Sequence, residues 1–145
     1  MQAPDSSKSR PTREDIALLM LRVTLGVLIL FHGLAKIRFP EARAFIVETL
    51  SSVGLPSVLH LGVYVGELVA PALLIAGIFS RPAAGLIAVN MLFALGLAHR
   101  GEYFALNEAG GWAIELQVIF LVTAIALALL GPGRLSVSRG QGAFG

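Results

Sequence analysis

One acidic residue, Glu67, lies in the middle of an apolar run that covers residues 58–79. A helix over this run would be long enough to cross a membrane, which would place the carboxyl group at bilayer depth. A central charge costs about 2.5 to 3.5 kcal/mol to insert, so an acid at that depth needs a partner, water or a proton. Such residues are usually kept for a task. Glu67 is therefore the first candidate for catalysis or ligand binding.

Two further polar residues are expected inside the membrane, Arg22 and Asn90. The axial offset between Arg22 and Glu67 is on the order of 8 Å, which a long guanidinium side chain could largely close. We expect Arg22 and Glu67 to form an ion pair, with Asn90 as an additional hydrogen-bond partner. Interhelical hydrogen bonds of about 0.6 kcal/mol each also hold many bundles together. The functional and the packing interpretations both stay open for Arg22 and Glu67, and packing is favoured for Asn90.

A second set of ionisable residues marks the ends of the apolar runs. It consists of His32, His60, His99 and Glu115. In an up-down bundle these four would lie at the same, outer end. His60, Tyr64 and Glu67 follow one helix face at spacings of four and three, as a proton path or a polar wall for a quinone head group would require. His99 and Asn90 are nine residues apart, so we expect them on opposite faces and not in one site.

The chain has no cysteine. It cannot by itself carry thiolate-bound metal, disulfide exchange or a cysteine-held iron–sulfur cluster. The histidines also lack the i, i+3 or i, i+4 spacing of metal-ligand pairs, so no metal site is predicted. No intrinsic cofactor is predicted either, and a redox role would use a bound quinone or a partner subunit. No basic, aromatic-interleaved surface indicates nucleic-acid binding.

The elements that must position these residues follow from composition. Hydrophobic residues make up 56% of the chain, charged residues 14%, and the mean hydropathy is +0.80. A soluble domain of 145 residues would have too few polar groups to cover its surface. Four continuous apolar segments, each about long enough for a membrane span, cover residues 16–35, 58–79, 82–99 and 112–130. The pattern predicts an all-α integral membrane four-helix bundle with up-down topology.

The segments between and beyond the spans are also informative. Pro40 can begin a short helix that Gly54 ends, and we expect this amphipathic helix to lie at the outer interface between spans 1 and 2. Residues 1–15 are expected to be a disordered tail, residues 16–135 the membrane domain and residues 136–145 a flexible tail. Lys and Arg side chains number six on the side of both termini (Lys8, Arg10, Arg13, Arg81, Arg134, Arg139) and four on the other side (Lys36, Arg38, Arg43, Arg100). This imbalance favours cytoplasmic termini.

Motifs along the chain resemble one family. They are Leu21-Arg22 with Gly26, then His32-Gly33 and Lys36, then Glu67 with Gly77, Phe79 and Arg81, and finally the run from Gly131 to Ser136. In order and spacing, over residues 18–136, the chain is similar to the DoxX family of small four-helix membrane proteins. The resemblance implies Arg22, His32, Gly33, Lys36, Glu67 and Arg81 as site positions. A glycine pair often found after the family glutamate is replaced here by Val69, Ala70 and Pro71, which predicts a kinked second helix.

The resemblance also implies a setting. Members are named after a subunit associated with a terminal quinol oxidase and thiosulfate:quinone oxidoreductase, and others are linked to membrane complexes that handle oxidative stress. It therefore implies a multi-pass protein of a bacterial-type plasma membrane that helps bind quinone or relay protons for a partner oxidoreductase, as an accessory rather than a catalytic subunit. The catalytic candidates are Glu67, Arg22 and His32, and the candidates for a quinone site or proton path are His32, Lys36, His60, Tyr64, Glu67 and Glu115.

A second class of function stays open, namely a non-enzymatic small transporter or a membrane scaffold or assembly protein. Expected partners are the lipid bilayer, a redox protein subunit and, in a homo-oligomer, further copies of the chain.

Overall fold

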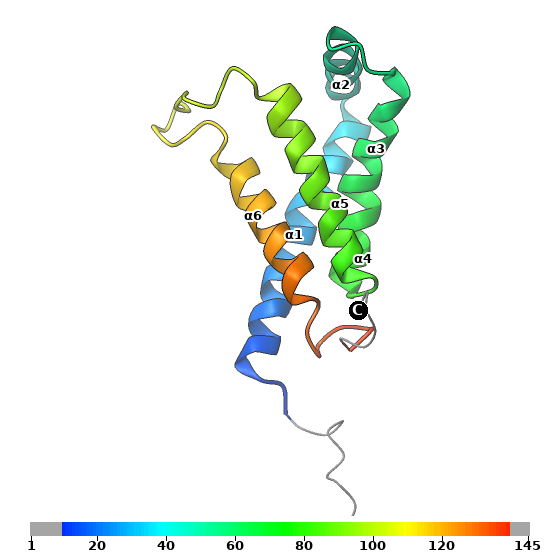
Figure 1. Ribbon diagram of the computed structural model, residues 1–145, viewed down its shortest axis with the longest axis vertical. Helices are drawn as coiled ribbons and strands as arrows, with labels where there is room; N and C mark the ends of the chain where they lie inside the picture. The colour runs from blue at the N-terminus through cyan, green and yellow to red at the C-terminus, as the bar shows by residue number, and fades with distance from the viewer. Residues whose placement is uncertain (1–9, 140–145) are drawn as a thin grey trace, which may run out of the picture.

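The computed structural model describes residues 10–139, and this part of the chain is helical (Figure 1). No β-strand occurs within it, apart from an isolated bridge between Leu106 and Trp112. The elements, in chain order, are α1 (Arg13–Arg38), α2 (Pro40–Ser52), η2 (Ser57–Leu59), α3 (His60–Tyr64), η3 (Val65–Val69), α4 (Ala70–Ala76), α5 (Ser80–Phe93), η4 (Ala94–Ala98) and α6 (Glu115–Leu130). The segments from η2 to α4 form one rod, and α5 with η4 forms another.

Three of these rods are long and apolar enough to cross a membrane, within the part of the chain that the structure describes. They are Arg13–Arg38, Ser57–Ala76 and Ser80–Ala98. α6 has 16 residues and is about 24 Å long, somewhat less than a hydrocarbon core of about 30 Å. Large apolar side chains such as Met20, Phe31 and Val122 are more than half exposed, which suits a surface in contact with lipid.

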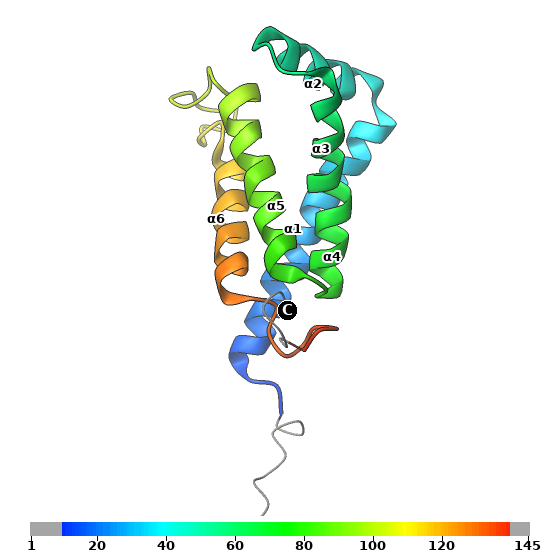
Figure 2. The same ribbon diagram turned by 45° about the vertical axis from the view of Figure 1, so that its right-hand side comes forward.

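The rods run side by side along the long axis of the molecule, and α2 crosses one end of them (Figure 2). α5 packs between α4 and α6, and α1 packs on α4 and α6. The buried core has large side chains such as Ile29, Leu74 and Ile87. It also has many small ones, Ala70, Ala83, Ala84, Ala88 and Ala124, which let helix backbones approach closely.

The ends of the chain differ from expectation. α1 begins at Arg13, because Thr12 and Asp15 form a capping box in which each side chain binds the backbone N–H of the other. Asp15 also accepts a hydrogen bond from the N–H of Arg134 at 2.9 Å, so residues 13–15 belong to the folded unit and not to a tail. Residues 136–139 are likewise packed on the protein, since Val137 donates to Ala76. Residues 1–9 and 140–145 of the expected tails lie outside the described residues.

The short helix expected at Pro40 is present as α2, with Pro40 at its first position. Of its side chains only Leu50 is buried. The tight reversal between the second and third rods is at Gly77–Phe79, where Gly77 and Phe79 have φ of 74° and 48°. Glycine adopts this left-handed conformation without steric cost, whereas Phe79 does not. The turn makes α4 and α5 antiparallel neighbours.

Candidate functional site

Glu67 lies in a widened helical turn. η3 is a π-helix, in which the N–H of Ala70 binds the carbonyl of Val65 five residues earlier. Pro71 follows, and because proline has no N–H, the carbonyl of Glu67 receives no helical hydrogen bond from it. The irregularity expected from Pro71 thus takes the form of a π-turn at the functional candidate, which is where such turns are frequently found.

Two glycines of α1 let this helix approach the second rod. A Cβ atom on Gly33 would lie 2.6 Å from the carbonyl oxygen of Glu67, and one on Gly26 would lie 2.5 Å from a side-chain carbon of Ile75. Gly26 and Gly33 are two helical turns apart and so lie on one face of α1. The close contact at Gly33 brings Lys36, one turn further on, to the level of the carboxylate.

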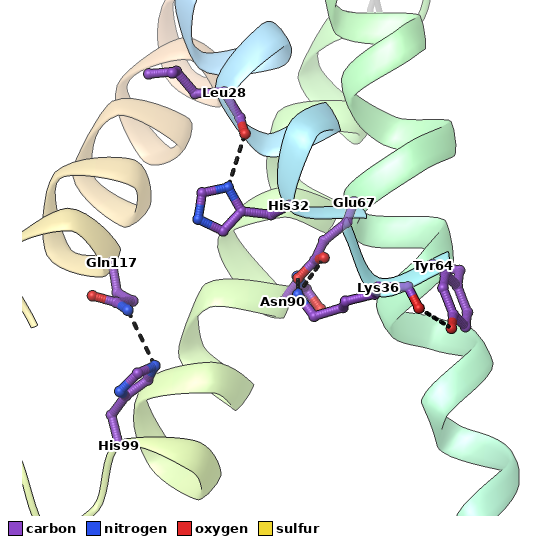
Figure 3. Close-up of polar contacts among 8 residues, drawn as sticks. All are labelled: Leu28, His32, Lys36, Tyr64, Glu67, Asn90, His99 and Gln117. Atoms are coloured by element: carbon purple, nitrogen blue, oxygen red, sulfur yellow. Dashed lines mark hydrogen bonds and ion pairs between the residues drawn. The ribbon is translucent and has the colours of Figure 1, made fainter. Parts of the chain in front are cut away.

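Lys36 is the cation that pairs with Glu67 (Figure 3). Its ammonium group donates to both carboxylate oxygens, at 2.7 and 2.5 Å. Asn90 donates to one of the same oxygens at 3.2 Å, as expected, and the absence of a side chain on Gly66 leaves room for it. Glu67 is only 3% exposed, so the carboxylate exchanges water for these three hydrogen bonds.

The expected ion pair between Arg22 and Glu67 is wrong. Arg22 is 1% exposed and donates to the carbonyl of Leu135 at 2.7 Å, at the opposite end of α1 from Lys36. Helical side chains lean toward the N-terminus of their helix, so the length of Arg22 carries its guanidinium group away from Glu67. The guanidinium group of Arg22 fills a space that is open because residue 77 is glycine. A Cβ atom on Gly77 would lie 1.8 Å from Nη1 of Arg22.

A cavity of about 570 Å³ adjoins the buried ion pair. Most of its lining comes from α2, the α3–η3 segment and the α5–η4 segment. Figure 2 shows α2 across one end of the rods that contain these two segments. We call this cavity the α3–α5 cavity. Lys36, Glu67 and Asn90 form its polar part, and His99 also lines it. The rest of the lining is almost wholly apolar and includes Phe45, Leu50, Leu59, Val63, Leu86, Val89, Phe93 and Leu97.

His99 and Asn90 line the same cavity, contrary to the expectation that they face opposite sides. The reason is η4, a second π-helix, in which the N–H of His99 binds the carbonyl of Ala94. One extra residue in a turn changes the direction of the following side chains by about 100°. Uniform α-helical spacing therefore places His99 on the wrong face.

His99 is held by two polar partners. Its Nδ1 lies 2.8 Å from a carboxylate oxygen of Glu102. Its Nε2 lies 3.1 Å from Nε2 of Gln117, a contact that Figure 3 shows. In this arrangement the amide of Gln117 donates to Nε2 and the ring donates from Nδ1 to Glu102. The buried Oε1 of Gln117 has no hydrogen-bond partner. A half-turn of the amide would let Oε1 accept from Nε2–H, so the same pair of neighbours suits the neutral and the protonated ring.

The other expected site residues are not brought into the cavity. His32 is exposed, its Nδ1 donates to the carbonyl of Leu28, and its ring packs edge-on against Phe120. Glu115 is exposed at the start of α6. Neither residue lines the α3–α5 cavity.

Of the predicted face of His60, Tyr64 and Glu67, the first two contact each other in the structure, whereas Glu67 bonds to Lys36 and Asn90. The Nδ1 of His60 donates to the carbonyl of Ser57, and its ring packs edge-on against Tyr64. The hydroxyl of Tyr64 donates to the carbonyl of Lys36 at 3.5 Å. Tyr64 and Glu67 both bond to Lys36, and neither His60 nor Tyr64 lines the α3–α5 cavity.

Arg81 has a structural contact. Its guanidinium group donates to the carbonyl of Leu129 at 3.0 Å and, at 3.5 Å, to those of Ala128 and Leu130. These carbonyls belong to the last turn of α6, where no helical N–H is left to satisfy them. Arg81 and Arg22 both act at this end of the molecule, away from Glu67.

Metal-binding side chains do not gather within residues 10–139. No group of three or more His, Cys, Asp or Glu residues is suited to hold an ion there. Chemically, the site is a desolvated carboxylate with an ammonium and an amide donor, which opens onto an apolar cavity that also has one histidine. Such a site can bind an apolar molecule that carries hydrogen-bond acceptors, and it can exchange protons with that molecule.

Comparison with known proteins agrees with this architecture. The DoxX family model matches residues 17–100. A Bacillus subtilis (strain 168) protein named "Putative oxidoreductase CatD" is 29% identical over 123 residues, which cover 85% of each chain. A Haemophilus influenzae (strain ATCC 51907 / DSM 11121 / KW20 / Rd) protein named "Uncharacterized protein" is 33% identical over 108 residues, 72% of this chain and 78% of that protein. No match to a solved structure was found. The chain is a member of the DoxX family of membrane proteins.

Proposed function

We propose that this protein is an accessory subunit of a quinone-linked membrane oxidoreductase, and that it binds the quinone in the α3–α5 cavity. The observation that carries the proposal is the Lys36–Glu67–Asn90 cluster at the edge of an otherwise apolar cavity. A quinone has an apolar ring and tail and two carbonyl oxygens that accept hydrogen bonds. Lys36 and Asn90 supply donors, and the aliphatic and aromatic lining fits the ring and tail.

Proton handling fits the same ligand. Conversion of a quinone to a quinol takes up two electrons and two protons. Glu67 and His99 both line the cavity, and carboxylate and imidazole groups can accept and donate protons, so in this proposal they deliver protons to the quinone. Glu102, 46% exposed, connects His99 to the aqueous side. The chain has no cysteine, so in this proposal a partner subunit supplies the electrons.

The membrane arrangement is part of the proposal. α6 packs along α5 and exposes Ile119, Val122 and Ile125, so it belongs in the bilayer with the three longer rods. We infer four spans in an up-down bundle, with both termini in the cytoplasm of a bacterial-type cell. α2 then lies at the outer interface. The name of the Bacillus subtilis relative supports a redox setting.

Filling the cavity tests the ligand site. Gly62 lines the α3–α5 cavity, and a Cβ atom added there would meet no atom within 4 Å, so we expect the side chain of Gly62→Leu to extend into the cavity. Gly85, on α5, also has open space but lies outside the cavity, so Gly85→Leu is the matched control. We expect Gly62→Leu to lose binding of a photoreactive quinone in mild detergent, whereas Gly85→Leu retains it. Equal labelling of the two variants would refute the cavity as the site.

A second experiment separates this function from a transporter or scaffold role. Glu67→Gln removes the protonatable carboxylate and keeps its size. We expect quinone-linked electron flow in membranes to fall, while the amount of folded protein stays unchanged. Normal electron flow in membranes that contain folded Glu67→Gln protein would favour the non-enzymatic role.

A further inference from the structure

A second hollow lies on the other side of Lys36. It has a volume of about 600 Å³ and is lined by Lys36, Ile37, Pro40, Arg43, Ala44, Val47 and Tyr64. These residues come from the end of α1, one side of α2 and the α3 helix. We call this hollow the α1–α2 groove. It shares only Lys36 with the lining of the α3–α5 cavity.

The polar side chains of the α1–α2 groove are the cations Lys36 and Arg43 and the hydroxyl of Tyr64, which donates to the carbonyl of Lys36. The side chain of Arg43 is exposed and makes no hydrogen bond or ion pair with any residue in the described range. Lys36 gives two of its three N–H bonds to Glu67, so one is free to point elsewhere. The groove lining contains no acidic residue; Glu41 and Glu48 of α2 are exposed and lie outside it. The groove thus favours an anion.

The remaining lining is apolar, which selects the kind of anion. Ile37 is 61% exposed, and Pro40, Ala44 and Val47 complete an apolar wall. A small hydrated anion would gain nothing from that wall, whereas an acyl chain would bury it. Figure 2 shows that α2 crosses the ends of the rods. With these rods in a bilayer, α2 and its residue Arg43 would lie at the depth of lipid head groups.

We propose that the α1–α2 groove binds an anionic phospholipid, with its phosphate on Arg43 and the free N–H of Lys36 and its acyl chain along Ile37 and Val47. The guanidinium group of Arg43 suits bidentate contact with phosphate oxygens. This site depends on the membrane placement of the helices and not on quinone binding in the α3–α5 cavity. The two ligands would lie on opposite sides of Lys36.

The test is native mass spectrometry of the whole protein with equal amounts of phosphatidylglycerol and phosphatidylcholine. We expect the wild type to retain phosphatidylglycerol preferentially, and Arg43→Gln to weaken that preference by about fivefold, the effect of one surface cation. Arg38→Gln is the matched control, because Arg38 is exposed at the same end of α1 and lies outside the groove. It should change the preference little. Circular dichroism checks that both variants fold.

Three outcomes would overturn the proposal. Arg43→Gln could leave the lipid preference unchanged, which would exclude the groove. Both variants could lose it equally, which would indicate general attraction to positive charge and no defined site. Inorganic phosphate could displace the lipid at the ionic strength where sodium chloride does not, which would identify a soluble anion as the occupant. Because Arg43 does not line the α3–α5 cavity, quinone labelling of Arg43→Gln reports on the proposed function separately.

Discussion

The pairing of Lys36 with Glu67 changes what the buried acid can do. Two hydrogen bonds from the ammonium group of Lys36 and one from the amide of Asn90 satisfy the buried carboxylate in place of water. A ligand that draws Lys36 away would leave Asn90 as the one remaining donor to this carboxylate among the described residues. The chemistry of Glu67 is therefore set by the position of one flexible side chain, of which 21% is exposed.

Removal of the cation tests this pair. Lys36→Met should destabilise the protein by roughly 3 kcal/mol, because Glu67 is left charged and buried; the partial exposure of Lys36 keeps the loss at the low end for a broken buried pair. The double variant with Glu67→Gln should recover much of that loss, since no unpaired charge remains. Thermal unfolding in mild detergent measures both. Equal loss in the single and the double variant would contradict the ion pair.

The tautomer of His99 is a second prediction for a single residue. Because the carboxylate of Glu102 can only accept, the neutral ring should carry its proton on Nδ1. Nitrogen-15 NMR of labelled histidine distinguishes the two tautomers. Glu102→Ala removes the acceptor and should shift the population toward Nε2–H. A wild-type ring protonated on Nε2 alone would show that Glu102 does not hold His99.

At the scale of elements, two π-turns shape the site. η3 contains Glu67 and η4 ends beside His99, and both turns border the α3–α5 cavity. The positions and lengths of the rods followed from the apolar runs, and so did the short helix at Pro40, because hydrophobic length and turn residues are local properties. The direction of His99 did not follow, because a π-turn changes the helical phase and leaves no clear mark in a single sequence.

The partner of Glu67 illustrates the same limit. Sequence marked Lys36 only as a position of the family motif, since it stands near the end of an apolar run and not within it. Its contact with Glu67 depends on the close approach of α1 at Gly33, which is a tertiary feature. Arg22 was placed with Glu67 by axial distance alone, which ignores the direction in which helical side chains lean.

The contact at Gly33 gives a prediction for the elements. Gly33→Ala would place a methyl group against the backbone of Glu67, so α1 would have to move away, at a cost of roughly 1 to 3 kcal/mol. Gly62→Ala is the matched control, because open space surrounds Gly62 and alanine favours the helix by about 1 kcal/mol. Unfolding in detergent should show a loss for the first variant and none for the second. A stable Gly33→Ala protein would mean that the helices are not in contact there.

At the scale of the whole molecule, the two ends are built differently. At the end where α1 begins, Arg22 ties α1 to the residues after α6, and Arg81 ties α5 to the last turn of α6. Gly77, directly after α4, leaves room there for Arg22. At the other end, residues of α2 line both the α3–α5 cavity and the α1–α2 groove. The first end, which we call the closed end, can hold the helices in place, while the other end can admit ligands.

Removal of the residues after Gly133 tests the closed end. The shortened chain loses the carbonyl of Leu135, so the buried guanidinium group of Arg22 has no acceptor, and we expect a loss of about 1 to 3 kcal/mol. In an Arg22→Met background the same truncation should cost less, because methionine needs no acceptor. Unfolding of the four proteins gives the coupling between the two changes. Purely additive losses would show that Arg22 and the last residues act independently.

The contacts of residues 134–138 also bear on how membrane topology can be mapped. Reporter enzymes are commonly joined to successively shortened chains. A junction at Gly131 or Gly133 would separate the last helix from residues 134–138, which bond to Ala76 and Gly77. Such a fusion would report the location of a last helix that has lost these contacts. A reporter joined after Arg139 keeps the contacts of residues 134–138, so the location of the reporter describes the native protein.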